Sequence, residues 1–242
     1  ERKNIPNILL NGYKDNGRTL PWRSKNEENL VSRRNDPYLI WVSEIMLQQT
    51  TVKAVIPYFN SFIDTWPTVF NLANAKEEDV YSMWAGLGYY SRARNLIKCA
   101  RIISQDYKGR FPNSVGELLK LPGIGPYTSA AIVAIAFDKK ATVVDANVER
   151  VMARIFSLRK PIIEVKKQIY ALSDKLTPTE RSGDYAQAVM DLGATICRPI
   201  NPLCYRCPLS KVCLSRIKNI VHLVPKKSRR KEKPIRYGTI YV

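Results

Sequence analysis

Residues 121–128 have the sequence LPGIGPYT and lie between two segments with helical spacing of apolar residues, 114–119 and 127–137. Gly123 and Gly125 allow the backbone to turn tightly and to approach a ligand closely. The helix that follows offers unpaired N–H groups and the positive end of its dipole to an anion. The stretch therefore predicts a hairpin between two helices that holds a phosphate group through its backbone.

The same helical periodicity extends over most of the chain, and short turns containing Gly or Pro separate the segments. Asp36 before Pro37 predicts one helix start, and Ser114 with Glu117 predicts a capping box at another. With 242 residues and 45% hydrophobic content, the chain can bury one large core or two modest ones. We therefore expect an all-α fold. The predicted helices are Tyr38–Gln49, Val52–Trp66, Glu77–Trp84, Ser91–Tyr107, Ser114–Leu119, Tyr127–Phe137, Asn147–Phe156, Glu164–Leu176 and Asp184–Cys197.

The charge of the chain indicates a polyanionic partner. Its 39 Lys and Arg residues against 21 Asp and Glu give a net charge of +18 and a pI of about 9.8. Basic side chains gain affinity for nucleic acid by releasing condensed counterions. We see no strongly amphipathic basic helix and no apolar run long enough to cross a bilayer, so nucleic acid is favoured over membrane. The charged, Asn-rich start lacks the plan of a signal peptide, so we expect a cytoplasmic protein, nucleoid-associated if bacterial.

Four cysteines near the end of the chain have metal-ligand spacing. Cys197, Cys204, Cys207 and Cys213 follow the pattern C-x6-C-x2-C-x5-C, which suits a [4Fe–4S] cluster. Zinc is the main alternative, although structural zinc sites usually have two close pairs and only Cys204 and Cys207 form one here. A disulfide framework is the ordinary alternative. Cys99 lies at an apolar position of a helical segment and is expected to pack in the core.

Glu44 is the first candidate catalyst, because its neighbours one helical turn away, Ile40, Trp41 and Leu47, are apolar. Burial of a carboxylate costs free energy and raises its pKa, as a proton donor requires. The alternative is a glutamate on a narrow polar stripe with Gln48 and Thr51.

Asp145 is the second candidate, placed between the apolar stretch 141–144 and the helix that starts near Asn147. Helix capping is the ordinary explanation of such an aspartate. The same position favours the ionised form, which suits an anion that stabilises a developing cation. One neutral and one charged carboxylate would divide the roles of acid and nucleophile. His222 is the only histidine, so acid–base chemistry is expected to use carboxylates, tyrosine or lysine.

Taken in order, residues 43–50 (SEIMLQQT), 84–90 (WAGLGYY), the hairpin, residues 144–148 (VDANV) and the four cysteines resemble the MutY-type adenine DNA glycosylases of the endonuclease III superfamily. The resemblance extends over residues 15 to 220. It implies a six-helix barrel with a helix–hairpin–helix over residues 24–140, and a second helical domain of residues 1–23 and 141–221 that carries a [4Fe–4S] cluster on the four cysteines. The implied monomeric enzyme removes adenine mispaired with 8-oxoguanine or guanine in double-stranded DNA.

The resemblance also implies roles for individual residues. Glu44 would protonate adenine N7, Asp145 would stabilise or attack the oxocarbenium ion, and Asn147 would position the sugar and water. Tyr127 stands where bifunctional relatives have a Schiff-base lysine, so strong β-lyase activity is not expected. Gly123 and Gly125 would bind a DNA phosphate. The adenine pocket would comprise Trp22, Arg23, Leu47, Gln187 and Met190, and residues at the oxidised guanine or wedged into the base stack would be Gln49, Thr50, Leu87 and Tyr89.

Three features depart from the family pattern. Residues 145–147 are Asp-Ala-Asn where the family usually has Asp-Gly-Asn, a form also found in thymine-mismatch relatives. Residues 24–35 form a charged insertion. Residues 222–242 predict a basic linker, followed at 237–242 by the start of a strand, leading toward a missing C-terminal domain.

Two alternative functions follow. A thymine-mismatch glycosylase on the same scaffold is disfavoured by Glu44, because thymine has no N7 to protonate. A non-enzymatic iron–sulfur module that binds DNA would leave Glu44 and Asp145 with structural roles.

Overall fold

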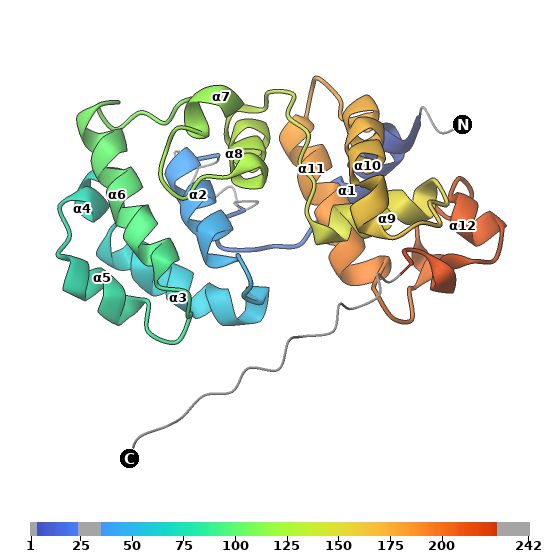
Figure 1. Cartoon of the computed structure of the whole chain (residues 1–242), viewed down its shortest axis with the longest axis horizontal. Helices are drawn as coiled ribbons and strands as arrows, with labels where there is room; N and C mark the ends of the chain where they lie inside the picture. Colours follow the sequence, from blue (N-terminus) through green and yellow to red (C-terminus); the bar gives the residue numbers. More distant parts are fainter. Residues whose placement is uncertain (1–3, 24–34, 227–242) are drawn as a thin grey trace, which may run out of the picture.

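The structure is a computed structural model that describes residues 4–23 and 35–226. In these ranges the regular elements are helical, and β-type pairing is limited to the isolated bridges Leu20–Arg23 and Pro161–Lys226. The all-α prediction is therefore confirmed for this part of the chain (Figure 1). The α-helices are α1 (Ile5–Asn16), α2 (Pro37–Met46), α3 (Val52–Thr65), α4 (Val69–Ala73), α5 (Glu77–Met83), α6 (Ser91–Gln105), α7 (Val115–Leu118), α8 (Pro126–Phe137), α9 (Ala146–Ile155), α10 (Ile162–Leu176), α11 (Ser182–Asp191) and α12 (Leu214–Ile217).

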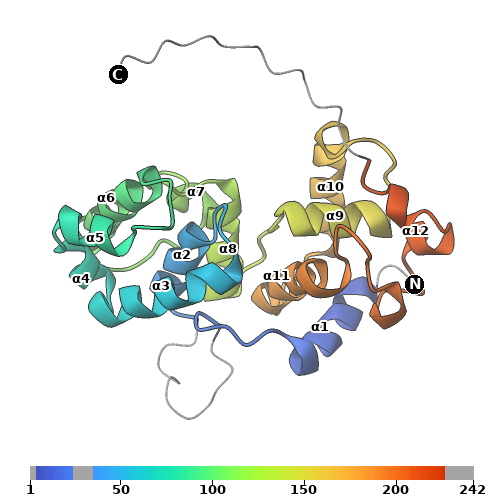
Figure 2. The ribbon, with the colours of Figure 1, turned by 90° about the horizontal axis from the view of Figure 1, so that it is seen from below.

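The helices form two groups that lie side by side. Helices α2 to α8 make up one group, and α1 lies with α9 to α12 in the other (Figures 1 and 2). Helix α1 packs against α11 although the whole first group separates them in sequence. The domain boundaries at residues 24 and 140 stay predictions. The predicted insertion at 24–35, apart from Asn35, and the predicted strand at 237–242 lie outside the described residues.

Side-chain caps set several helix starts where the sequence predicts them. Asp36 Oδ1 accepts a hydrogen bond from the Tyr38 N–H at 2.8 Å, with Pro37 in the first turn of α2. Ser114 Oγ accepts from the Glu117 N–H at 3.3 Å, which is one half of the predicted capping box. The Glu117 carboxylate instead accepts a bond from Lys120 Nζ at 2.6 Å.

Helix ends differ more from the predictions than helix starts do. The segment predicted as one helix from Asp184 to Cys197 is α11, which ends at Asp191, followed by a π-helical turn, η3 (Leu192–Ile196). The helix predicted to reach Gln49 ends at Met46, because Gln49 has a φ of 59° in the left-handed region. The π-helical turn η3 continues directly from Asp191, the last residue of α11, and Cys197 follows η3.

Helix α8 joins the two groups, because it packs against both α2 and α11. Its buried residues include Ala130, Ala131 and Ala134, whose small side chains permit close approach. At the start of α11, a Cβ added at Gly183 would lie 2.6 Å from the carbonyl oxygen of Ala134. Asp138, just after α8, accepts a hydrogen bond from the Gly183 N–H at 3.2 Å and holds the two helices together there.

The hairpin has the predicted tight turn. Gly123 has a φ of 78°, and the Ile124 N–H donates to the carbonyl of Leu121 at 3.2 Å. A Cβ at Gly123 would lie 2.8 Å from Cβ of Asn95, so the hairpin rests directly on α6. Gly125 caps α8 and has open space around its Cβ position, which leaves room for a ligand. No helix of the described ranges is both long enough and apolar enough to cross a bilayer.

Two glycine-to-alanine substitutions should have opposite effects on stability. Gly183→Ala forces a methyl group against the α8 backbone and should lower the free energy of unfolding by about 1–3 kcal/mol. Gly12→Ala, inside α1 with open space at its Cβ position, should raise it by about 0.5–1 kcal/mol. Urea denaturation of both variants measures this. Equal stability of the two would contradict the close α8–α11 contact.

Candidate active site

Glu44 lies on α2 with 7% of its surface exposed. Its pKa is raised to about 7, mainly by burial, and the negative charge of Asp145 contributes in the same direction. A hydrogen-bonding contact with the Tyr127 hydroxyl and the positive charge of Arg23 act in the opposite direction. The buried environment predicted for Glu44 is confirmed, and the exposed polar stripe is wrong, because Thr51 caps α3 instead. Near neutral pH this carboxyl group can donate a proton.

Tyr127 lies in the first turn of α8, and its hydroxyl donates to Sδ of Met190 at 3.4 Å. Burial, followed by the negative charges of Glu44 and Asp145, raises the pKa of Tyr127 well above its ordinary value. The phenol therefore stays protonated and neutral beside the two carboxyl groups. It can exchange hydrogen bonds with Glu44 but cannot act as an amine nucleophile.

Asp145 is the N-cap of α9, as the sequence predicts. Its Oδ1 accepts a hydrogen bond from the Val148 N–H at 2.7 Å, and its Oδ2 accepts one from Asn147 Nδ2 at 2.9 Å. The carboxylate is half-buried, and its charge reaches both Glu44 and Tyr127. Capping and an electrostatic role are therefore compatible in one residue.

Arg150 fixes Asn147 from the other side. Its Nη2 donates to Asn147 Oδ1 at 2.8 Å and to the Gly193 carbonyl at 2.7 Å, and its Nε donates to the carbonyl of Cys197 at 2.8 Å. Hydrogen bonds thus run from the Asp145 carboxylate through Asn147 and Arg150 to the backbone of the first of the four cysteines. The sequence analysis identified Asn147 but missed Arg150.

Arg23 is held by Asp191, a buried residue at the end of α11 that the sequence analysis missed. Arg23 Nη1 donates to both carboxylate oxygens of Asp191, at 2.8 and 2.9 Å, and Arg18 Nε donates to Oδ1 at 2.6 Å. Two arginines around one buried carboxylate leave positive charge on the side of Glu44, where it lowers the pKa of that group. Asp191 lies among the apolar residues of the run 188–192. The same kind of apolar surroundings led to the prediction that Glu44 is buried, so this signal could also have pointed to Asp191.

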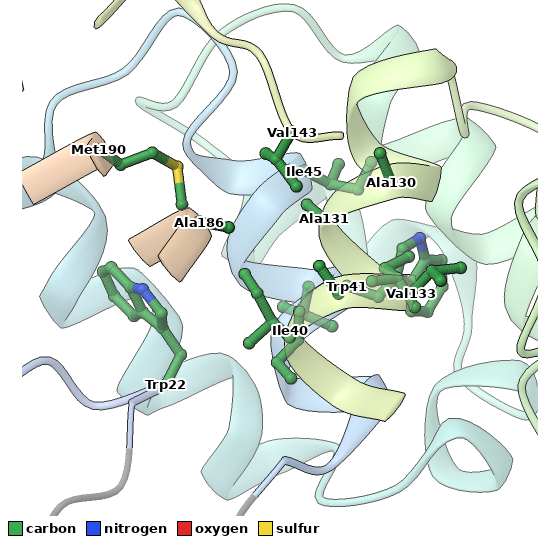
Figure 3. Packing of buried hydrophobic residues seen from close by; sticks show 14 of the residues in the cluster. Trp22, Ile40, Trp41, Ile45, Ala130, Ala131, Val133, Val143, Ala186 and Met190 are labelled. Carbon is green, nitrogen blue, oxygen red and sulfur yellow. The ribbon is translucent and has the colours of Figure 1, made fainter. Parts of the chain in front are cut away.

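A pocket of about 230 Å³ is lined in part by Arg23, whereas Glu44, Tyr127 and Asp145 do not line it. Trp22, Arg23 and Gln187, three of the five residues predicted for the base pocket, line it together with Ile40 and Arg181. Figure 3 shows Trp22 and, from α11, Met190 on the side of α2 toward which Ile40 points. Met190 instead contacts Tyr127, and Leu47 lies half-buried at the end of α2. Neither of these two lines the pocket.

The residues predicted to lie at the oxidised guanine or to wedge into the base stack fall into two sets. Gln49 and Tyr89 are exposed, Tyr89 by 61%, and both have left-handed φ values, 59° and 48°. Leu87 is buried at 6% exposure, and Thr50 is half-buried. In the free protein only Gln49 and Tyr89 therefore present their side chains to a partner, and contact of Leu87 with DNA stays a prediction.

The four clustered cysteines are half-buried thiols, and none of the five cysteines forms a disulfide. The pKa of Cys207 is raised to about 12, mainly by burial, and the charges of the three other thiols of the set contribute in the same direction. Cys197 Sγ accepts a hydrogen bond from Arg154 Nη1 at 3.3 Å. Among the described residues, no three His, Cys, Asp or Glu side chains converge as ligands of one metal ion. The charges of the three other thiols act on Cys207, and four soft thiolates are the donor type that a [4Fe–4S] cluster would take. Cys99 is fully buried on α6, as predicted.

Residues 42–178, more than half of the chain, match the model of the HhH-GPD superfamily of base excision DNA repair proteins. The chain belongs to this family. The resemblance derived from the sequence is therefore confirmed at the level of the superfamily.

Particular relatives are similar over most of the chain. The adenine DNA glycosylase of Buchnera aphidicola subsp. Baizongia pistaciae is 39% identical over 90% of this chain and 63% of its own length. The human adenine DNA glycosylase is 43% identical over 86% of this chain and 38% of its own. The chain thus spans less than two thirds of these relatives. The structure of a thermostable thymine-DNA glycosylase superposes with a TM-score of 0.77 at 31% identity, covering 90% of this chain and 97% of that one.

Removing the buried carboxyl group should stabilise the protein, and the effect should depend on pH. The pKa of Glu44 is higher in the folded state than in the unfolded state, so ionisation opposes folding as pH rises from about 4.5 to 7. Glu44→Gln should change stability little at pH 4.5 and increase it by up to about 3 kcal/mol at pH 8. Urea denaturation at the two pH values tests this. A gain that is the same at both would mean that the pKa of Glu44 is ordinary.

Proposed function

We propose that this chain is the base-releasing part of an adenine DNA glycosylase, which hydrolyses the N-glycosidic bond of adenine mispaired with 8-oxoguanine or guanine in double-stranded DNA. The observation that carries the proposal is Glu44, a buried acid with a pKa of about 7 that interacts with Tyr127, Asp145 and Arg23. Of these groups, Arg23 lines a pocket. The names and identities of the relatives, 39% and 43%, support adenine as the base.

In the proposed reaction Glu44 donates its proton to N7 of an extruded adenine. Protonation lets adenine leave as a neutral molecule. Without it, the base would take the electron pair of the breaking C–N bond and leave as an anion. A base inside a duplex cannot reach a buried carboxyl group, so the nucleotide must leave the stack first. The Tyr127 hydroxyl keeps the acid oriented, and Arg23 prevents its pKa from rising further.

Asp145 acts on the sugar. Its carboxylate, held by the Val148 N–H and the Asn147 amide, faces the positive charge that develops as the C–N bond breaks. Because these hydrogen bonds hold the carboxylate in place, the group stabilises an oxocarbenium ion without first reorganising. Asn147, fixed in turn by Arg150, is suited to orient the water that completes hydrolysis.

The enzyme is proposed to be monofunctional. A lyase needs an amine to form a Schiff base, and Tyr127 supplies a neutral phenol at this position. Its product would be an abasic site in an intact strand.

A thymine-mismatch glycosylase is the second candidate, favoured by the 31% identity to the thymine-DNA glycosylase over nearly its whole length. The residues 145–147, Asp-Ala-Asn, agree with it. Adenine is preferred because thymine offers no N7 for Glu44.

Single-turnover release of adenine from an adenine:8-oxoguanine duplex tests the proposal, with adenine:guanine, thymine:guanine and matched duplexes in parallel. Glu44→Gln should nearly abolish release while binding persists, because the amide cannot deliver a proton. Asp145→Asn should slow release by about 10²–10³-fold, also with binding retained. The wild-type rate should stay constant below about pH 7 and fall about tenfold per pH unit above it, as Glu44 ionises. Release of thymine but not adenine, or near-normal release by either variant, would contradict the mechanism.

The four cysteines are proposed to hold a [4Fe–4S] cluster in the domain formed by residues 1–23 and 141–221, beside a six-helix barrel of residues 24–140. When bound, the cluster would cross-link the chain segment 197–213 through its four cysteines and would take no part in hydrolysis. Arg154 and Arg150 hold the backbone of Cys197 from inside the domain.

Metal content tests the ligand set. Purified protein should be yellow-brown and contain about four irons per chain. Cys207→Ser should lose most of the iron, whereas the matched control Cys99→Ser, which removes a buried thiol on α6, should keep it. Iron analysis and visible absorbance provide the readout. Stoichiometric zinc without iron after anaerobic purification would overturn the assignment.

A further inference from the structure

Arg92, in the first turn of α6, is a buried arginine with 8% of its surface exposed. Among the described residues no carboxylate forms an ion pair with it. A buried charge without a counterion is costly unless polar groups surround it. Its surroundings therefore require an explanation that core packing does not give.

The two terminal nitrogens of Arg92 bind carbonyls of two different segments, and Nη2 also donates to Thr50 Oγ1 at 3.5 Å. Nη1 donates to the carbonyls of Ile45, Met46 and Gln48 at 3.0, 3.0 and 2.6 Å. Nη2 donates to the carbonyls of Leu87 and Gly88 at 2.8 and 3.2 Å. The guanidinium group thus joins the end of α2 to the loop before α6.

The carbonyls that Arg92 binds immediately precede the two exposed left-handed residues. The Gln48 carbonyl belongs to the peptide plane that leads into Gln49, and the Gly88 carbonyl to the one that leads into Tyr89. A left-handed conformation costs free energy for residues other than glycine and persists only where neighbouring contacts enforce it. Arg92 enforces both at once, and its guanidinium carbon lies 5.7 Å from the centre of the Tyr89 ring.

We propose that Arg92 is a positioning residue for mispair recognition: it sets the separation and orientation of Gln49 and Tyr89, so that both side chains enter the duplex together. The inference rests on the proposed function for its substrate, a mispaired duplex. It goes beyond that function in assigning recognition to a buried residue that touches no DNA.

Lysine cannot replace arginine in this role, because one ammonium group cannot direct separate nitrogens to two loops. Arg92→Lys keeps the charge and tests the geometry. Arg101→Lys is the matched control, since Arg101 lies on the same helix but is half-buried and pairs with Glu77.

The first measurement needs no DNA. Hydrogen exchange of amides in residues 47–50 and 87–90 should become faster in both loops together in Arg92→Lys, and stay unchanged in Arg101→Lys. Faster exchange in only one loop, or in neither, would overturn the proposed link between the loops. This result is independent of whether the wild-type chain releases adenine.

The second measurement is the ratio of the affinities for a mispaired and a matched duplex. The adenosine in both duplexes carries a 2′-fluorine, which destabilises the oxocarbenium ion and so blocks cleavage. Arg92→Lys should lower this preference by about tenfold or more, as expected for loss of one stacking contact, without weakening binding to matched DNA. If Arg92→Lys only destabilised the fold, it would lower the fraction of active protein but leave the ratio of affinities unchanged. An unchanged ratio would therefore reject the positioning role. Absence of adenine release by wild type would reject the proposed function instead.

Discussion

The burial of the Glu44 carboxyl group is the constraint around which this site is built. A carboxyl group among apolar side chains is tolerated only if it is protonated or if neighbouring groups stabilise its charge. Both hold in part for Glu44, whose raised pKa favours the protonated form while Tyr127 and Arg23 favour the charged form. Tyr127 and Arg23 limit the pKa rise that burial and Asp145 cause. These groups come from α8, from the segment after α1, and from the start of α9, so the acid exists only when both helix groups are in contact.

Several arginines in this chain bind backbone and not phosphate. Arg92, Arg150 and Arg154 direct their N–H groups at carbonyl oxygens at the ends of helices and turns. A planar fork of donors can satisfy several carbonyls at once, which lysine cannot do. Part of the net charge of +18 is therefore internal and contributes to the positions of loops and cysteines. Composition alone overstates the charge available to a nucleic acid.

The sequence predicts local features well where the deciding interactions are local. The caps at Asp36, Asp145 and Ser114, the turn at Gly123 and the buried position of Glu44 depend on residues within a few positions of each other. The short helices α4 and α12 were not predicted, because four or five residues form a helix only with tertiary support. Asp191 and Arg92 were missed for a related reason: their partners lie in other elements, and no spacing rule connects them.

Glu44 and the exposed Gln49 lie at the same end of α2, Glu44 inside the helix and Gln49 just after it. Glu44 lies next to Ile45 and Met46, whose carbonyls receive Arg92, and the exposed Gln49 follows one turn later. Residues 47–50 follow directly on the last turn of α2, the turn that contains the buried Glu44. The pKa of Glu44 depends mainly on its burial. In the proposed function, the position of residues 47–50 and the retention of the proton on Glu44 therefore depend on neighbouring backbone contacts, which would link recognition of the duplex to the strength of the acid through the end of α2.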